Sequence, residues 1–199
     1  TNDEKADNNI TNEQELIREV NNDIYTYQLI RTSHGKLRVR INVNFLNKEI
    51  FEAFQSHNEL LLDNFLSEQV ADDAILVAIT FISPLSNEEG KLLTQNLQMK
   101  VISYGILGSV DEEVVSSYFS PISYSIEDFV TQQTLEGVGN VTYDGIMTIT
   151  GIIDSNALKI LSENQNVMLL DLTANEIQKS EMDDFGQSID LEQIGIPNP

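Results

Sequence analysis

Cysteine is absent from this chain of 199 residues. Its absence excludes disulfide bonds, thiolate metal sites and a cysteine nucleophile together, so the fold must be stabilised by packing. With 41% hydrophobic residues, the chain has enough apolar material for one compact domain with a substantial core. We therefore expect a single core with smaller additions.

Basic residues are scarce. The 11 Lys and Arg residues stand against 32 Asp and Glu residues, which gives a formal net charge of −21 and an isoelectric point near 4.1. Such a charge disfavours long-range attraction to phosphate backbones and to anionic lipid heads, so we expect no nucleic-acid partner. The acidity itself is typical of a solvated surface, with solubility at high salt or weak capture of divalent cations as alternatives.

Long apolar runs are also missing. The best one, Ala74 to Ile82, is interrupted by Thr80 and falls well short of the roughly 20 residues that span a bilayer. No membrane span is expected. The sequence opens at Thr1 without a methionine and stays polar as far as Asn12, a pattern left when a leader is removed. Together with the missing cysteines, this start predicts an exported protein, extracellular or at the cell surface.

Two observations bear weakly on that compartment. Cleavage of an expression tag would explain the same start and would leave the compartment open. Asn9 and Asn140 each begin an Asn-x-Thr triplet, so both are glycosylation candidates, although such triplets are common by chance.

Catalytic motifs are missing as well. The two histidines, His34 in an expected turn and His57 in or beside an expected helix, have no recognisable catalytic partner nearby in the sequence. There is no Gly-x-Ser-x-Gly elbow, no His-Glu-x-x-His pair and no phosphate-binding glycine-rich loop. Adjacent carboxylates are expected in so acidic a chain without any acid–base role. We expect a protein that is not an enzyme and that has no cofactor.

One segment has metal-ligand spacing. Glu181, Asp183 and Glu192 fall near positions 1, 3 and 12 of a calcium loop, with Gly186 near position 6. Phe185 at position 5 cannot donate an oxygen, and no helix pair clearly flanks the segment. Glu181, Asp183 and Glu192 are calcium candidates on this spacing, and an acidic tail without a metal is the favoured interpretation.

The first third of the chain divides into an arm and a sheet with a helix. Residues 1–23 are a polar N-terminal arm, in which Leu16, Ile17 and Val20 predict about one and a half turns of helix and are candidate contacts to another molecule. Residues 24–73 alternate as a β-hairpin from Ile24 to Phe45, with its turn at 33–35, and then follow helical spacing. That helix is expected to begin after Asn47, with a break near 56–58.

The second hairpin strand concentrates basic residues on one face. Lys36, Arg38 and Arg40 alternate with apolar residues, so all three share the face turned away from the core. This face could receive an acidic tail or a neighbouring subunit. The alternative, which we favour, is a charged strand facing solvent that discourages edge aggregation.

Residues 74–174 contain the same pattern twice. A buried strand, a capped helix and a second strand occupy 75–106 and again 141–172. Two such β-α-β units predict an α+β protein with a ferredoxin-like split β-α-β sheet, to which the hairpin, the helix and the terminal arms are added. The insertion at 111–139 predicts a helical segment that could carry a binding surface. Residues 175–199 form an acidic tail with too little periodic hydrophobicity to fold alone.

The second β-α-β unit resembles the propeptide and inhibitor module of subtilisin-like proteases. The resemblance is carried by residues 141–174, namely Val141-Thr142-Tyr143-Asp144-Gly145-Ile146, the helix around Ala157 to Leu161, and Asn166 to Asp171. It implies a ferredoxin-like fold and a protease inhibitor or chaperone. It is an apolar pattern without diagnostic chemistry, and the acidic tail replaces the inhibitory extension that the family uses.

These features favour a non-enzymatic cell-surface or extracellular protein that assembles. Polar arms flank a compact sheet domain, and an arm could add a strand to a neighbouring copy. We therefore expect the partner to be other copies of the same chain, as in a self-assembling filament held by its terminal arms. A protease propeptide-like inhibitor or chaperone is the alternative.

Overall fold

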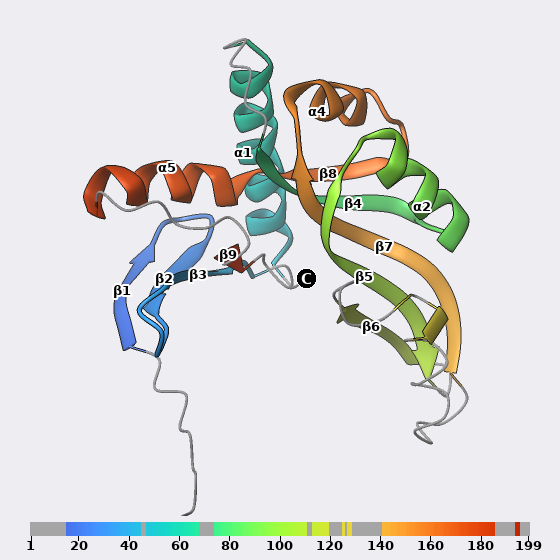
Figure 1. Ribbon diagram of the computed structural model, residues 1–199, viewed down its shortest axis with the longest axis horizontal. Helices are drawn as coiled ribbons and strands as arrows, with labels where there is room; N and C mark the ends of the chain where they lie inside the picture. Colours follow the sequence, from blue (N-terminus) through green and yellow to red (C-terminus); the bar gives the residue numbers. More distant parts are fainter. Residues whose placement is uncertain are drawn as a thin grey trace, which may run out of the picture.

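The computed structural model describes residues 15–44, 47–67, 74–110, 113–119, 125, 127–128, 141–185 and 194–195. These residues form an α+β fold with two sheets (Figure 1). We call them sheet A, which begins with the predicted hairpin, and sheet B, which contains the two β-α-β units.

Sheet A has the strand order β1-β2-β3-β9. Its strands are β1 (Glu15–Asn21), β2 (Thr26–Arg31), β3 (Leu37–Asn42) and the short β9 (Ile194–Gly195). The hairpin β2–β3 confirms the predicted one, with the turn at Gly35, whose φ is +76°. The first three strands are antiparallel, and β9 runs parallel to β3.

The helix predicted around Leu16, Ile17 and Val20 is wrong, because these residues lie in β1. Val20 pairs with Tyr27, and the register shifts between Leu16 and Arg18. A helix this short would form few hydrogen bonds to offset the cost of its nucleation. Pairing with β2 instead satisfies the backbone groups along β1. Residues 15–21 of the predicted arm are thus part of sheet A, and residues 1–14 lie outside the described residues.

Sheet B has the strand order β6-β5-β7-β4-β8. Its strands are β4 (Ile75–Leu85), β5 (Lys100–Val110), β6 (Glu113–Phe119), β7 (Val141–Ile153) and β8 (Val167–Asp171). Because β7 is antiparallel to both β4 and β5, these two strands are parallel and are separated by β7. In the same way, β7 and β8 are parallel and are separated by β4. The two β-α-β units therefore interleave.

The structure corrects two further predictions. Residues 113–119 of the insertion, expected to be helical, form β6 and pair with β5 from Tyr104 to Val110. The predicted tail begins with helix α5 (Thr173–Phe185), which is held by two residues in the second core, Ala174 and Ile177. The weak hydrophobic periodicity of the tail did not predict a helix, and packing against the second core stabilises the helix that forms.

The helices begin at polar side chains. Helix α1 (Lys48–Ser67) follows Asn47, whose side-chain oxygen accepts from the amide of Glu49 at 3.0 Å, and it runs without the predicted break. Helix α2 (Asn87–Asn96) begins with a capping box between Ser86 and Glu89. Asp154 caps α4 (Ser155–Ser162). These caps satisfy amides that have no partner within their own helix.

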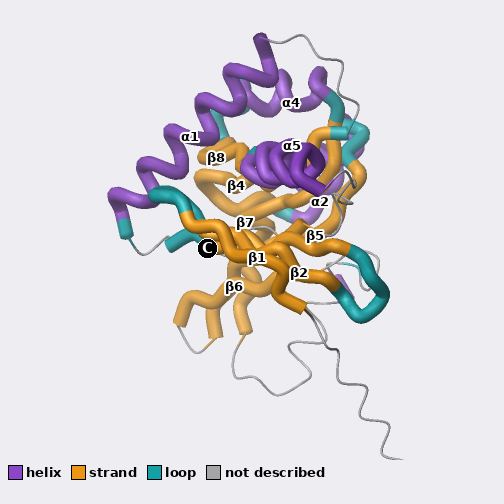
Figure 2. Tube along the Cα trace, turned by 90° about the vertical axis from the view of Figure 1, so that its left-hand side faces the viewer, coloured by secondary structure: helices purple, strands orange, loops and turns teal. Residues whose placement is uncertain are grey.

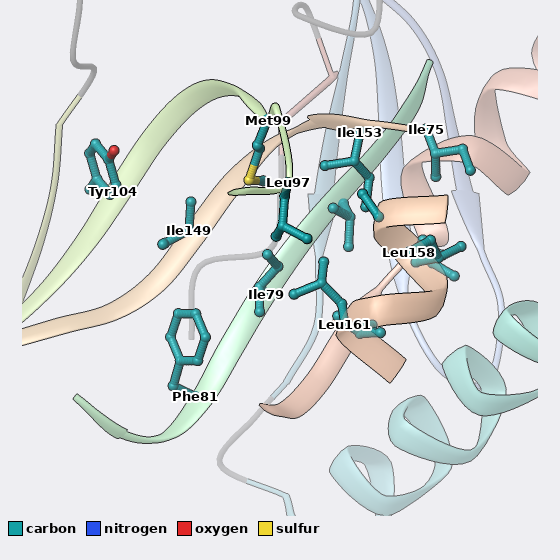
Figure 3. Packing of buried hydrophobic residues seen from close by; sticks show 14 of the residues in the cluster. Ile75, Ile79, Phe81, Leu97, Met99, Tyr104, Ile149, Ile153, Leu158 and Leu161 are labelled. Atoms are coloured by element: carbon teal, nitrogen blue, oxygen red, sulfur yellow. The ribbon is translucent and has the colours of Figure 1, made fainter. Parts of the chain in front are cut away.

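The first core lies between sheet B and the helices α2 and α4. Leu158 and Leu161 of α4 are fully buried and point toward Ile75, Ile79 and Ile153 of the sheet (Figure 3). Alternate residues of β4 supply this face, as expected for a strand whose side chains alternate between two faces.

The second core lies on the opposite face of sheet B. Leu76 and Leu169 face the inner surface of sheet A together with α5. Helix α1 takes part in both cores, with Phe54 in the second and Phe65 against the first. Figure 2 shows the helix running past β8 toward α4. One helix thus ties the two sheets together.

None of the described helices is long and apolar enough to cross a bilayer.

Candidate interaction surface

The outer face of β3 carries a row of basic residues, Lys36, Arg38 and Arg40, which we call the basic row. Their neighbours Leu37, Val39 and Ile41 are buried in the second core, so the strand itself turns the three basic side chains outward. All three are exposed, as the sequence predicted. The fold therefore fixes three of the 11 basic residues in one line on one surface.

The basic row has no acidic partner within the part of the chain that the structure describes. Neighbouring carboxylates on sheet A have partners within the sheet: Glu15 contacts Arg31 at 3.2 Å, and Glu19 accepts a hydrogen bond from Gln28 at 2.6 Å. Across the described residues, no ion pair involves Lys36, Arg38 or Arg40. Their charge is available to another molecule.

Of the three apolar residues predicted to make contacts, only Leu16 is strongly exposed, at 54%. Ile17 and Val20 are partly buried and pack against the second core. Leu16 pairs with Ile30 of β2, and Ile30 pairs with Arg38 of β3. An exposed leucine therefore lies on the same sheet as the basic row, two strands away.

A buried ion pair joins α5 to sheet A. Glu181 is fully buried, and its Oε1 accepts from the Nε of Arg18 at 3.2 Å and from the hydroxyl of Tyr27 at 2.6 Å. Burial raises the pKa of Tyr27 to about 12, and the hydrogen bond to Glu181 adds to this rise. These three residues come from β1, β2 and α5, so the group is a structural clamp.

This arrangement bears on the calcium candidates. Residues 181–185 are helical in α5, whereas positions 1 to 5 of a calcium loop are not. Glu181 is occupied by Arg18 and Tyr27, and Glu192 lies outside the described residues. No group of three potential metal ligands occurs among the residues that the structure describes.

A second polar cluster joins α1, α5 and β2. The Nε2 atom of His57 lies 2.7 Å from Oε2 of Glu176, which also accepts from the hydroxyl of Tyr25 at 2.8 Å. Burial raises the pKa of Tyr25, and the hydrogen bond to Glu176 contributes. Sequence reasoning missed these partners because they lie 119 and 151 residues apart along the chain.

Asp171 lies at the end of β8, close to this second cluster. Its carboxylate accepts from the backbone amide of Thr173 at 3.0 Å. Burial raises the pKa of Asp171, against the opposing effects of Thr173 and of the nearby His57. Because Asn58 in turn donates to Thr173 and accepts from the amide of Leu172, these groups fasten the start of α5 to α1.

A pocket of about 180 Å³ lies between α1, α4 and β8. Its walls are mixed, with Leu62, Leu161 and Met168 beside polar groups such as Asn58. Glu59 is its one ionisable lining residue among the described residues. A single carboxylate does not make the acid and base pair that most hydrolytic chemistry requires.

The remaining candidates lie outside the described residues. These are the two glycosylation candidates, Asn9 and Asn140. The described interaction features therefore reduce to the basic row with Leu16.

Comparison of the chain with protein-family models, with curated proteins and with solved structures found no match in any of the three.

Proposed function

We propose that this protein is a non-enzymatic assembly protein of the cell surface or the extracellular space, and that it binds other copies of itself through the basic row. The observation that carries this proposal is a row of three cations that has no ion-pair partner among the described residues, on a molecule whose formal net charge is −21. Wherever a second copy approaches, it presents mostly acidic surface, so this row is the natural point of attraction.

Internal packing supports a contact through the face of sheet A. The described parts of both predicted arms pair within their own chain, β1 with β2 and β9 with β3. An exchange of these strands between copies would first have to break those pairs. Contact through an already formed face does not carry that cost, and it leaves the fold of each copy unchanged.

The absence of catalysis is part of the proposal. The two polar clusters, around Glu181 and around Glu176, connect elements of the fold, and their partners are largely buried. This supports a structural role for His57. The extracellular location stays a prediction from the sequence.

We also propose that sheet B with α2 and α4 is a ferredoxin-like unit. Its support is the order β5-β7-β4-β8, in which the two parallel pairs interleave, with both helices packed on one face. Many unrelated activities occur on such units, so the fold by itself favours no activity.

The same interleaved topology is compatible with a second candidate function, that of a protease propeptide-like inhibitor or chaperone. The test is the hydrolysis of a peptide substrate by subtilisin in the presence of the full chain. Inhibition at micromolar concentration would favour this candidate over assembly. Full activity of the protease at that concentration would rule it out for this protease class.

Assembly is tested by sedimentation velocity of the full chain over a range of concentrations at about 0.15 M salt. We expect association that the variant Lys36→Ser/Arg38→Ser/Arg40→Ser lacks. The matched control Lys48→Ser/Lys159→Ser/Lys179→Ser removes three exposed cations from helices and changes the net charge equally. A wild-type protein that stays monomeric, or a control as defective as the basic-row variant, would refute the proposal.

A further inference from the structure

We propose that the basic row of one copy docks on the acidic outer face of α1 of the next copy. This inference rests on the proposed function, and it names the surface that the basic row recognises. Three independent properties carry it: the position of the acidic residues on α1, the spacing of the two charged rows, and an exposed leucine on each of the two surfaces.

Helix α1 presents three acidic residues in a line. Glu52, Glu59 and Asp63 are all exposed, and their separations of seven and four residues place them on one side of the helix. The opposite side carries Phe54, Asn58 and Phe65 into the two cores. The line thus lies on the side of α1 opposite the cores, and we call it the acidic line. Its Glu59 also lines the pocket between α1, α4 and β8.

The acidic line is mostly unpaired. Glu52 lies 3.5 Å from Lys48 in an exposed i,i+4 pair, which stabilises little and exchanges readily with other partners. Among the described residues, neither Glu59 nor Asp63 forms an ion pair. Its charge is therefore as available as that of the basic row.

Other acidic groups of the described chain are less suited. Glu89 is held in the capping box of α2, and Glu127 pairs with Lys91 at 2.9 Å. Glu176 and Glu181 are engaged in the two polar clusters. Helix α1 combines three exposed carboxylates on one element with a largely free line of charge.

The two charged rows have similar dimensions. At about 3.4 Å per strand residue, Arg38 and Arg40 are about 7 Å apart, and Lys36 and Arg40 are about 14 Å apart. At 1.5 Å per helix residue, Glu59 and Asp63 are about 6 Å apart along the axis, and Glu52 and Asp63 are about 16 Å apart. The largest mismatch involves Glu52 and Glu59, which are about 10.5 Å apart along the axis. Their counterparts Lys36 and Arg38 are about 7 Å apart, and long lysine and arginine side chains absorb this difference of about 4 Å.

An exposed leucine adjoins the acidic line, and another lies on sheet A two strands from the basic row. Leu60 follows Glu59 and is 59% exposed, which is unusual for a leucine on a helix that contributes to two cores. Leu16 on sheet A is 54% exposed. When the two rows meet, contact between these leucines would bury apolar surface and add to the electrostatic attraction.

Docking of this kind joins two different surfaces. The pair then keeps one free basic row, on one copy, and one free acidic line, on the other, so further copies add in the same orientation. Such a contact generates a closed ring or an open filament, and it does not stop at a symmetric dimer. The expected product is therefore larger than a dimer at high concentration.

The test is a charge exchange between the two rows. We call Lys36→Glu/Arg38→Glu/Arg40→Glu the reversed-row variant and Glu52→Lys/Glu59→Lys/Asp63→Lys the reversed-line variant. Each alone should be monomeric in sedimentation velocity, because like charges meet at every contact. An equimolar mixture of the two should associate as the wild type does, because every contact is again between opposite charges.

A control separates this pairing from a general charge effect. The variant Asp128→Lys/Asp144→Lys/Glu163→Lys has the same net charge as the reversed-line variant, and its substitutions lie at exposed positions on other elements. It should associate by itself. Mixed with the reversed-row variant it should not restore extended assembly, because its intact acidic line repels the reversed row, so the reversed-row variant can only cap the chains. Circular dichroism and urea unfolding of each variant establish that it is folded.

The outcomes distinguish the two proposals. If the reversed-row variant is monomeric but the reversed-line variant still associates, then the basic row binds a different surface and the present inference is wrong, whereas the proposed function stands. Failure of the mixture to associate when both variants are monomeric and folded also overturns the inference. A monomeric wild-type protein removes both proposals.

Discussion

Single polar side chains connect α5 to sheet A and to α1 in this protein. Glu181, Glu176 and Asn58 each accept or donate across elements that are more than 100 residues apart in the sequence. A buried charged group of this kind stabilises the fold only while its partner is present. Single substitutions can therefore test how much the contact between α5 and sheet A contributes to stability.

Substitution in the ion pair between Arg18 and Glu181 should be among the most destabilising of the single changes. Replacing Arg18 by Ala leaves a fully buried carboxylate without its cation, and we expect the free energy of unfolding to fall by about 3 kcal/mol. Arg31→Ala is the matched control, because the Arg31–Glu15 pair is exposed at both ends and should contribute less than about 1 kcal/mol. Urea unfolding followed by circular dichroism measures both, and equal losses would contradict a special role for Glu181.

Buried tyrosines make the protein sensitive to alkali. The pKa of Tyr27 is raised to about 12, and burial together with the charge of Glu127 raises the pKa of Tyr143 to about 12. The ordinary value is 10.0, so the folded protein holds these protons more tightly than the unfolded chain does. The resulting stabilisation is complete below pH 10 and is lost as the pH rises toward 12.

We therefore expect the free energy of unfolding to decrease between pH 10 and pH 12. Lysines also lose their charge in this range, so the variant Tyr143→Phe is needed to isolate a tyrosine contribution. It removes the hydrogen bond to Asn87 at every pH, but its loss between pH 8 and pH 11.5 should be smaller than that of the wild type. Parallel curves for the two proteins would show that Tyr143 does not contribute.

At the scale of the element, Gly145 shapes the long strand β7. Its φ of +139° is a conformation that other residues rarely adopt, and a Cβ there would lie 2.5 Å from the carbonyl oxygen of Leu85. The pairing of β4 with β7 shifts its register between Thr80 and Leu85, next to this position. The glycine thus permits the close approach of two strands where the ladder is irregular.

Gly145→Ala should consequently destabilise the protein by about 3 kcal/mol or more, from backbone strain and from the clash together. Gly35→Ala is the control, because Gly35 also has a positive φ but a Cβ there would meet nothing within 4 Å. That change should cost about 1 kcal/mol through backbone strain alone. Thermal unfolding of the two variants measures the difference, and similar melting temperatures would mean that the strands relax around the new methyl group.

The elements that the sequence predicted correctly are those with signals at both ends. For α2, Ser86 and Glu89 mark the start, and for α4 Asp154 does so. The strands that flank these helices contain the apolar runs of both β-α-β units. Local capping and periodicity were sufficient here because these signals lie within each element, even though the strands of one unit pair with those of the other.

The elements that were predicted wrongly are short apolar sets whose period fits both a helix and a strand. Residues 16–20 and 113–119 were expected to be helical and became β1 and β6, because β2 and β5 provide open edges for pairing. Helix α5 was missed because its anchors, Ala174 and Ile177, are few. The basic row was recognised from alternation, whereas the clusters around Glu176 and Glu181 depend on contacts that no local pattern encodes.

At the scale of the whole molecule, the net charge competes with the proposed contact. Two copies that each carry a formal charge of −21 repel one another, while the basic row and the acidic line attract at close range. The range of each effect depends on salt, because the Debye length is about 30 Å at 0.01 M, about 8 Å at 0.15 M and about 3 Å at 1 M. Repulsion between whole molecules is screened at lower salt than attraction between touching side chains.

Association should therefore be strongest at an intermediate salt concentration. At 0.01 M salt the repulsion extends across the molecule, and at 1 M salt the attraction between the rows is itself weakened. Sedimentation velocity at 0.01, 0.15 and 1 M sodium chloride tests this directly, with the basic-row variant carrying serines as the control that should stay monomeric throughout. Association that rises steadily up to 1 M would indicate contact through apolar surface, since salt screens the acidic repulsion without weakening apolar burial.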